Sequence, residues 1–99
     1  MKLLHPPGVD PLARHRLLLS VPAFWPCWPF LPVVRRNRGG EELGVLFDAL
    51  GLLGLSGYSS TVFLANFFEL PATIDAMLAL PREAHDSGDE LIDAGWRVD

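Results

Sequence analysis

Ser59-Ser60-Thr61-Val62-Phe63-Leu64-Ala65-Asn66-Phe67-Phe68 is the segment that decides the fold expected for this chain of 99 residues. In an extended strand, alternate side chains point to opposite faces, and here both sets are largely apolar. A strand that is apolar on both faces is typical of the interior of a sheet, with protein packed above and below it. The segment therefore predicts a central strand, and the rest of the chain must supply two covering layers.

The stretch before this strand predicts a β-hairpin. Val33 to Arg36 and Glu41 to Asp48 are its two expected strands. They are joined by Asn37-Arg38-Gly39-Gly40, a loop whose glycines allow the positive φ angles that tight hairpins require. The glycine-punctuated residues 48–57 are then expected to connect the hairpin to the central strand.

Charged side chains are expected to face each other across this hairpin. A loop of four residues places Arg36 opposite Glu41 and Arg35 opposite Glu42. Opposite charges across a ladder add only about 0.2 to 1 kcal/mol each, yet they help to fix the register. The alternative use of Arg35, Arg36 and Arg38 is contact with phosphate or nucleic acid. The nearby acids and the net charge of −4 favour the structural use.

Two short helices and a last strand are predicted near the C-terminal end. Pro71 suits the first position of a helix that Pro81 ends. Ser87-Gly88-Asp89-Glu90 is a capping box that begins a second helix, and Gly95 fits its left-handed stop position. Trp96-Arg97-Val98 can then return as a strand. The predicted helix between Pro71 and Pro81 has an apolar stripe made of Ile74, Met77 and Leu78.

The N-terminal third has a different composition. Residues 1–32 hold seven of the nine prolines and two of the three tryptophans. Asp10 can cap a short helix over Pro11 to Leu19, and the remainder is expected to be extended or polyproline-like. This Pro/aromatic-rich extended arm would precede a small domain, residues 33–99. The order arm, β, β, β, α, α, β predicts a single α+β domain with a mostly antiparallel sheet and two short C-terminal helices.

The overall composition is that of one ordinary globular domain, with 49% hydrophobic and 20% charged residues. Residues 1–40 carry six basic side chains against one acidic side chain, a balance of +5, whereas residues 41–99 carry eleven acidic against two basic, a balance of −9. This polarity predicts that the basic part packs on the acidic part, within one molecule or between two. A single cysteine and the poor support for a secretory signal favour the cytoplasm.

An alternative to a soluble domain is a membrane-anchored protein inserted through residues 49–68. That segment has the length of a span, but its glycine, serine, threonine and asparagine residues cancel most of the favourable insertion free energy. The other uncharged stretch, Leu17 to Val34, contains four prolines and cannot form one continuous helix. The pattern therefore argues against a membrane partner.

Catalytic and metal-binding chemistry has little support. Cys27 could act as a nucleophile with His85, backed by Asp86, in a cysteine-dependent enzyme. However, Cys27 lies among prolines and tryptophans, away from any helix N-terminus that would activate it, so a buried, inert thiol is expected. The histidines and carboxylates lack zinc spacing, and the glycines from Gly51 to Gly57 form no phosphate-binding loop. We expect no enzyme activity, no metal and no cofactor.

The proline-aromatic arm is the feature that most favours a binding function. Pro-x-x-Pro spacing occurs twice between Pro26 and Pro32, and a basic residue follows where it could orient such a ligand. In the structural alternative, the aromatic side chains cover the protein's own sheet, or that of a neighbouring subunit. The sequence thus predicts a small protein-binding or accessory module that forms a homo-oligomer or binds another protein. The predicted contact residues are Trp25, Trp28, Phe30 and Arg35.

Overall fold

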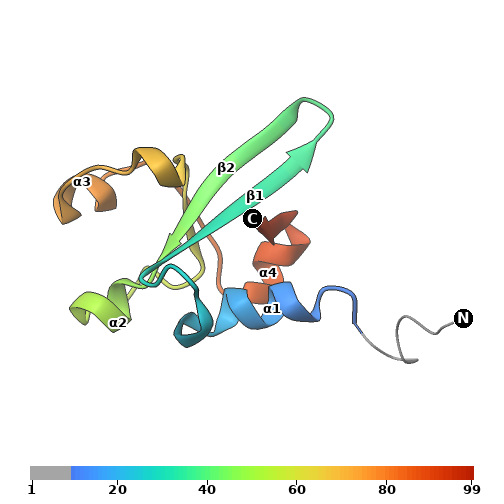
Figure 1. Ribbon diagram of the computed structural model, residues 1–99, viewed down its shortest axis with the longest axis horizontal. Helices are drawn as coiled ribbons and strands as arrows, with labels where there is room; N and C mark the ends of the chain where they lie inside the picture. Colours follow the sequence, from blue (N-terminus) through green and yellow to red (C-terminus); the bar gives the residue numbers. More distant parts are fainter. Residues whose placement is uncertain (1–9) are drawn as a thin grey trace, which may run out of the picture.

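The structure is a computed structural model that describes residues 10–99, and these form one antiparallel sheet with short helices around it (Figure 1). The strand order is β4-β3-β2-β1-β5. The strands are β1 (Phe30–Asn37), β2 (Gly40–Phe47), β3 (Thr61–Phe63), β4 (Arg82–Ala84) and β5 (Trp96–Val98). The helices are α1 (Ala13–Ser20), α2 (Ala49–Leu53), α3 (Ile74–Leu78) and α4 (Gly88–Asp93), with 3-10 turns η1 (Pro22–Phe24) and η2 (Phe67–Glu69).

The α+β class and the mostly antiparallel sheet are confirmed. The first nine residues of the predicted arm lie outside the described residues.

The β1–β2 hairpin is the longest pair of strands, and its tip projects past the helices (Figure 1). Its register places Arg35 opposite Glu42 and Arg36 opposite Glu41, which confirms the predicted pairing. β1 is twice as long as expected because it begins at Phe30, whereas β2 has the expected length and is shifted by one residue. Residues on either side of the proposed boundary at residue 32 therefore belong to the same strand.

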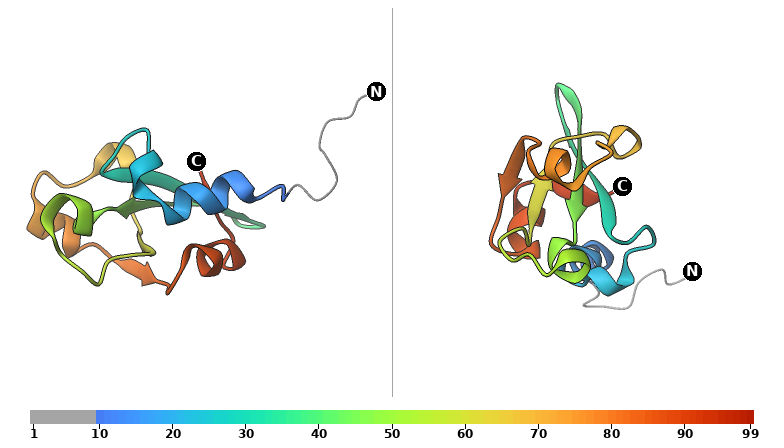
Figure 2. Two further views of the ribbon diagram at one scale, coloured as in Figure 1. Left: turned by 90° about the horizontal axis from the view of Figure 1, so that it is seen from below. Right: turned by 90° about the vertical axis from the view of Figure 1, so that its left-hand side faces the viewer.

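Protein covers both faces of the sheet. One face packs against α1 and α4, and the other packs against α3 and the segment around η2. Figure 2 shows α3 at the opposite end of the molecule from α4. The strand side chains buried on the first face are Leu31, Val33, Leu46, Val62 and Trp96. Those buried on the second face are Val45, Phe47 and Phe63.

The predicted central strand is right for its first part and wrong for its second. Thr61 to Phe63 form β3 between β2 and β4, and all three residues are buried. The strand then ends, because the side chain of Asn66 accepts a hydrogen bond from the Phe68 N–H and begins η2. Leu64 is 39% exposed and Phe68 is 88% exposed. The expected strand Ser59–Phe68 is therefore three residues long.

Local capping explains where the helices begin and end. The prediction that Pro71 begins α3 is wrong. The Thr73 hydroxyl accepts a hydrogen bond from the Ala76 N–H and fixes the start of the helix at Ile74. Ser87 caps α4 as predicted, and Gly95 follows the helix with a φ of 97°. The short helix α2 was not predicted. It begins where the Asp48 side chain accepts the Gly51 N–H and ends at Gly54, which is left-handed.

The region expected to be an extended arm is folded onto the sheet from residue 10 onward. The predicted helix over Pro11 to Leu19 is present as α1, and η1 follows it. The Trp25 side chain is 7% exposed, and its indole nitrogen donates a hydrogen bond of 2.6 Å to the Leu18 carbonyl oxygen. This contact turns the chain back over the core instead of letting it extend.

Candidate functional site

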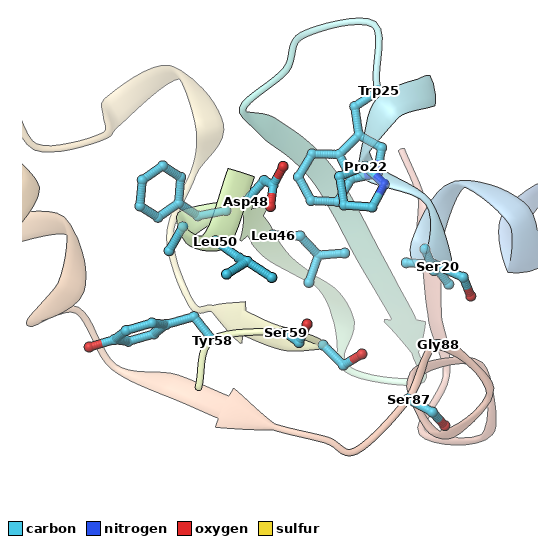
Figure 3. Close-up of a pocket in the computed structure, with 14 residues that line it drawn as sticks. Ser20, Pro22, Trp25, Leu46, Asp48, Leu50, Tyr58, Ser59, Ser87 and Gly88 are labelled. Carbon is cyan, nitrogen blue, oxygen red and sulfur yellow. The ribbon is translucent and has the colours of Figure 1, made fainter. Parts of the chain in front are cut away.

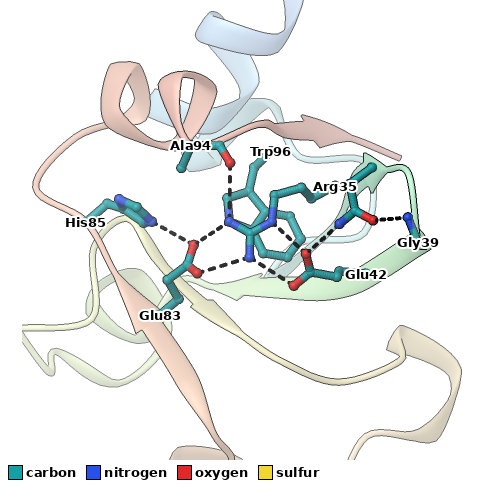
Figure 4. Close-up of polar contacts among 8 residues, drawn as sticks. Arg35, Gly39, Glu42, Glu83, His85, Ala94 and Trp96 are labelled. Carbon is teal, nitrogen blue, oxygen red and sulfur yellow. Dashed lines mark hydrogen bonds and ion pairs between the residues drawn. The ribbon is translucent and has the colours of Figure 1, made fainter.

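Arg35 is the centre of the most extensive polar cluster in the described residues (Figure 4). Its Nε and Nη2 donate to the Glu42 carboxylate at 3.0 and 2.9 Å. Nη1 and Nη2 donate to the Glu83 carboxylate, both at 3.1 Å, and Nη1 also donates to the Ala94 carbonyl oxygen at 3.2 Å. The guanidinium carbon lies 4.4 Å from the centre of the Trp96 ring. A guanidinium has five N–H groups, so every donor of Arg35 has an acceptor.

Glu83 makes two further hydrogen bonds in this cluster. Its Oε2 lies 2.9 Å from His85 Nε2 and 2.7 Å from Trp96 Nε1. The hydrogen bond with His85, then that from Trp96, and then contact with Arg35 lower the pKa of Glu83 from 4.5 to about 2, against the opposing effect of burial. Hydrogen bonds to Glu42 and Glu83 in turn raise the pKa of Arg35. Arg35 and Glu83 are therefore both ionised at neutral pH.

The hydrogen bonds of Arg35 connect distant elements of the fold and do not form an open binding site. Arg35 links β1 to Glu42 on β2, to Glu83 on β4 and to Ala94 after α4. Because no donor of Arg35 remains open, the side chain has none to offer to a phosphate or to a partner without breaking an existing bond. We conclude that the cluster stabilises the sheet.

Acid should weaken this cluster through Glu83. The folded-state pKa lies below the ordinary value, so the carboxylate stabilises the fold above pH 4.5, and this stabilisation is lost as the pH falls from 4.5 towards 2. Since a third of the Glu83 side chain is exposed, we expect the free energy of unfolding to fall by only about 1 kcal/mol over this pH range. Glu83→Gln should lose that part of the pH dependence in urea unfolding at a series of pH values. The exposed Asp93→Asn is the control, and equal pH slopes for all three proteins would contradict the prediction.

The four predicted contact residues do not form one surface. Trp25 is buried on the α1–α4 side, whereas Phe30 packs on the α3 side. Trp28 is 45% exposed, and its indole nitrogen donates to Asp48 Oδ2 at 2.8 Å. Arg35 belongs to the cluster described above. Of the four, Trp28 has the most exposed side chain.

A pocket of about 280 Å³ lies beside Trp25, between the end of α1, the start of α2 and the N-terminal end of α4 (Figure 3). A serine nucleophile needs a neighbouring base, yet none of the described residues that line this pocket is a histidine, lysine or arginine. Both carboxylate oxygens of Asp48 already accept hydrogen bonds, from Gly51 and Trp28. The pocket therefore offers hydroxyl groups but no free base. Its hydroxyl groups belong to Ser20, Ser59, Ser60, Ser87 and Tyr58.

A larger concavity of about 630 Å³ lies beside the hairpin and η2, and we call it the apolar groove. Phe67 packs inward at its base, with its ring centre 6.2 Å from that of Phe30 and 5.3 Å from that of Phe68. Phe68 points away from the protein with 88% of its surface exposed, and Leu43 is 40% exposed. Asp99 is the one charged residue among the described residues that line the groove. The groove is lined by Cys27, Pro32, Val33, Leu43, Gly44, Asn66, Phe67, Phe68 and Asp99.

Cys27 is exposed and lines the apolar groove, so the expectation of a buried thiol is wrong. The chain turns tightly here, with the Phe30 N–H donating to the Cys27 carbonyl oxygen at 2.9 Å. The aromatic neighbours Trp25 and Phe30 take the inward positions, which leaves the thiol outside. His85, its suggested catalytic partner, hydrogen-bonds Glu83 in the Arg35 cluster instead.

Metal binding and membrane insertion are the two remaining possibilities that the sequence raises. Within residues 10–99, no three histidine, cysteine, aspartate or glutamate side chains lie close enough together to hold a metal ion. Over the same part of the chain, no helix is both long enough and apolar enough to cross a membrane. Residues 49–68, the suggested anchor, are instead divided among α2, β3 and the start of η2.

Two important residues were missed by the sequence reasoning. Glu83 lies in a polar segment with no local pattern, and only its contacts with distant residues reveal its role. The apolar pattern predicts that Phe68 lies in a buried strand, although Asn66, a residue type common at helix N-caps, signals that the strand ends before it. Compared with models of protein families, with curated proteins and with solved structures, this chain has no match.

Proposed function

We propose that this protein is a small protein-binding module that docks an apolar surface of its partner in the apolar groove. The supporting observation is Phe68, which stands at the rim of the groove with 88% of its surface exposed. Fully burying a phenylalanine side chain is worth about 1.5 to 3 kcal/mol relative to leaving it exposed. Aromatic side chains beside a concave apolar surface are typical anchors of protein interfaces.

This proposal changes which part of the predicted arm contacts a partner. Trp25 and Phe30 pack within the protein, and the donors of Arg35 are all occupied. Cys27 and Pro32, which lie in the same region of the sequence, do line the groove. The arm region therefore contributes one wall of the proposed surface, and η2 contributes the other.

A second set of exposed apolar side chains surrounds α2. Leu50 is 60% exposed, and three further leucines of this segment are each 40% to 42% exposed. We favour the groove because it combines a larger cavity with the more exposed aromatic side chain. The α2 residues supply a matched control, since they have similar chemistry at another place. They are Leu50, Leu52, Leu53 and Leu55.

The single cysteine allows the proposal to be tested without changing the sequence of the groove. A photoreactive maleimide attached to Cys27 should cross-link the protein that occupies the groove when the labelled chain is added to an extract of its own cells. Phe68→Ser should reduce the yield of that cross-link about tenfold, which corresponds to about 1.4 kcal/mol of lost contact. The measurement is mass spectrometry of the cross-linked product.

Leu52→Ser is the control, because it removes an exposed apolar side chain outside the groove. It should leave the cross-link unchanged. Urea unfolding of both variants checks that each remains folded. Equal cross-linking of Phe68→Ser and the unchanged protein would overturn the proposal.

A further inference from the structure

The geometry points to a second copy of this chain as the occupant of the apolar groove, an inference that rests on the proposed function. Two copies would pack groove to groove about a two-fold axis, with each Phe68 entering the groove of the other copy. Arg38 at each hairpin tip would meet Asp99 of the other copy. A two-fold interface requires one surface that carries both a projecting group and a place to receive it. Phe68 and the groove provide both on the same side of the molecule.

Two charges that remain outside ion pairs, one at the hairpin tip and one in the groove, fit this arrangement. Arg16, Arg35 and Arg36 each pair with an acid from the second part of the chain, which confirms the predicted contact between the basic and acidic parts within one molecule. Among the described residues, neither Arg38 nor Asp99 has an ion-pair partner within 4.0 Å. Both are exposed, and Asp99 lines the groove.

Arg38 and Asp99 lie on opposite sides of the middle of the groove along β1, as pairing between two copies requires. Leu43 of the groove stands opposite Val34 on β1. Towards the tip, β1 ends at Asn37, roughly 10 Å beyond Val34 at the usual strand rise, and Arg38 follows in the turn. Asp99 donates its N–H to the Pro32 carbonyl oxygen, two residues or roughly 7 Å in the other direction. A two-fold axis perpendicular to β1 reverses the strand direction, so about such an axis the basic end of one copy lies over the acidic end of the other.

Pairing of strand edges is a less suitable way for two copies to meet. β2 pairs with β3 only through Val45 and Leu46, which leaves the outer edge of residues 40–44 open. That edge carries Glu41 and Glu42, and edge-to-edge contact of two copies would bring like charges together. At the other end of the sheet, the Val98 N–H donates to His15 Nδ1. The face of the hairpin is therefore the better surface.

Light scattering of the purified chain over a dilution series tests the inference. We expect the mass to rise with concentration from 10.9 kDa to twice that value. Phe68→Ser should remain monomeric, and Leu52→Ser should not change the association.

Arg38→Glu should raise the dissociation constant about three- to tenfold, because two symmetric rim contacts are lost. Adding Asp99→Arg to that variant should restore the association, whereas Arg14→Glu, a change to an exposed arginine on α1, should have no effect.

The outcomes separate this inference from the proposed function. A chain that stays at 10.9 kDa throughout, while labelled Cys27 still cross-links a different protein, overturns the second copy as occupant and leaves the groove as a binding site. A dimer that forms equally well with Phe68→Ser overturns the groove-to-groove packing. Monomers at every concentration, together with no cross-link that depends on Phe68, overturn both proposals.

Discussion

Trp96→Ala is expected to lower the free energy of unfolding by about 3 to 5 kcal/mol, as is usual for removing a large aromatic side chain from a core. The side chain is fully buried. From β5 at one edge of the sheet, its indole nitrogen reaches Glu83 on β4 at the other edge, at 2.7 Å. Arg35 stacks on the same ring. The substitution would leave a cavity and remove a donor from a charged acceptor, and urea unfolding measures the result.

Two companion variants separate packing from hydrogen bonding. Trp96→Phe keeps most of the ring but loses the donor to Glu83, so it should cost about 1 to 2 kcal/mol. Trp28→Ala removes a tryptophan that is 45% exposed and bonded to Asp48, and it should cost about 1 kcal/mol or less. If Trp96→Ala costs no more stability than Trp28→Ala, the buried indole is not central to the stability of the fold.

The sequence predicts the hairpin well because local chemistry specifies it. The loop length places Arg35 and Arg36 opposite their acidic partners, and the structure has that register. The central strand is predicted less well, since alternation of apolar residues also continues through a segment that leaves the sheet. Phe67 packs inward and Phe68 is exposed, which an apolar pattern alone does not distinguish. The decisive interaction is the side-chain bond of Asn66.

Other elements depend on contacts between distant residues. β4 is short and polar, so it has no strand-like pattern, yet it forms an edge of the sheet because Val62 and Glu83 pair across the ladder. The position of Trp25 likewise depends on the Leu18 carbonyl oxygen in α1. The groove brings residues from the turn at Cys27, from the hairpin, from η2 and from the C-terminal end together. No local pattern in any one of these segments indicates that the others lie beside it.

Gly44→Ala is expected to lower the free energy of unfolding by about 1 to 3 kcal/mol, although glycine in a strand is normally less favourable than alanine. A Cβ at this position would lie 2.3 Å from Val62 Cγ1 and 3.3 Å from two ring carbons of Trp96. Both neighbours are fully buried, so neither can move into open space. Gly39→Ala is the control, because its nearest contact would be Asn37 Oδ1 at 3.4 Å. Urea unfolding should show almost no change for that variant.

A double-mutant cycle shows whether the steric contact with Val62 is the cause. Val62→Ala alone should destabilise the protein by leaving a cavity in the core, and Gly44→Ala alone should destabilise it by overpacking. In the double variant, the new methyl group at residue 44 occupies space that Val62 Cγ1 has left. The combined cost should therefore be smaller than the sum of the two single costs by about 1 kcal/mol. Additive costs would place the strain of Gly44→Ala against Trp96 rather than against β3.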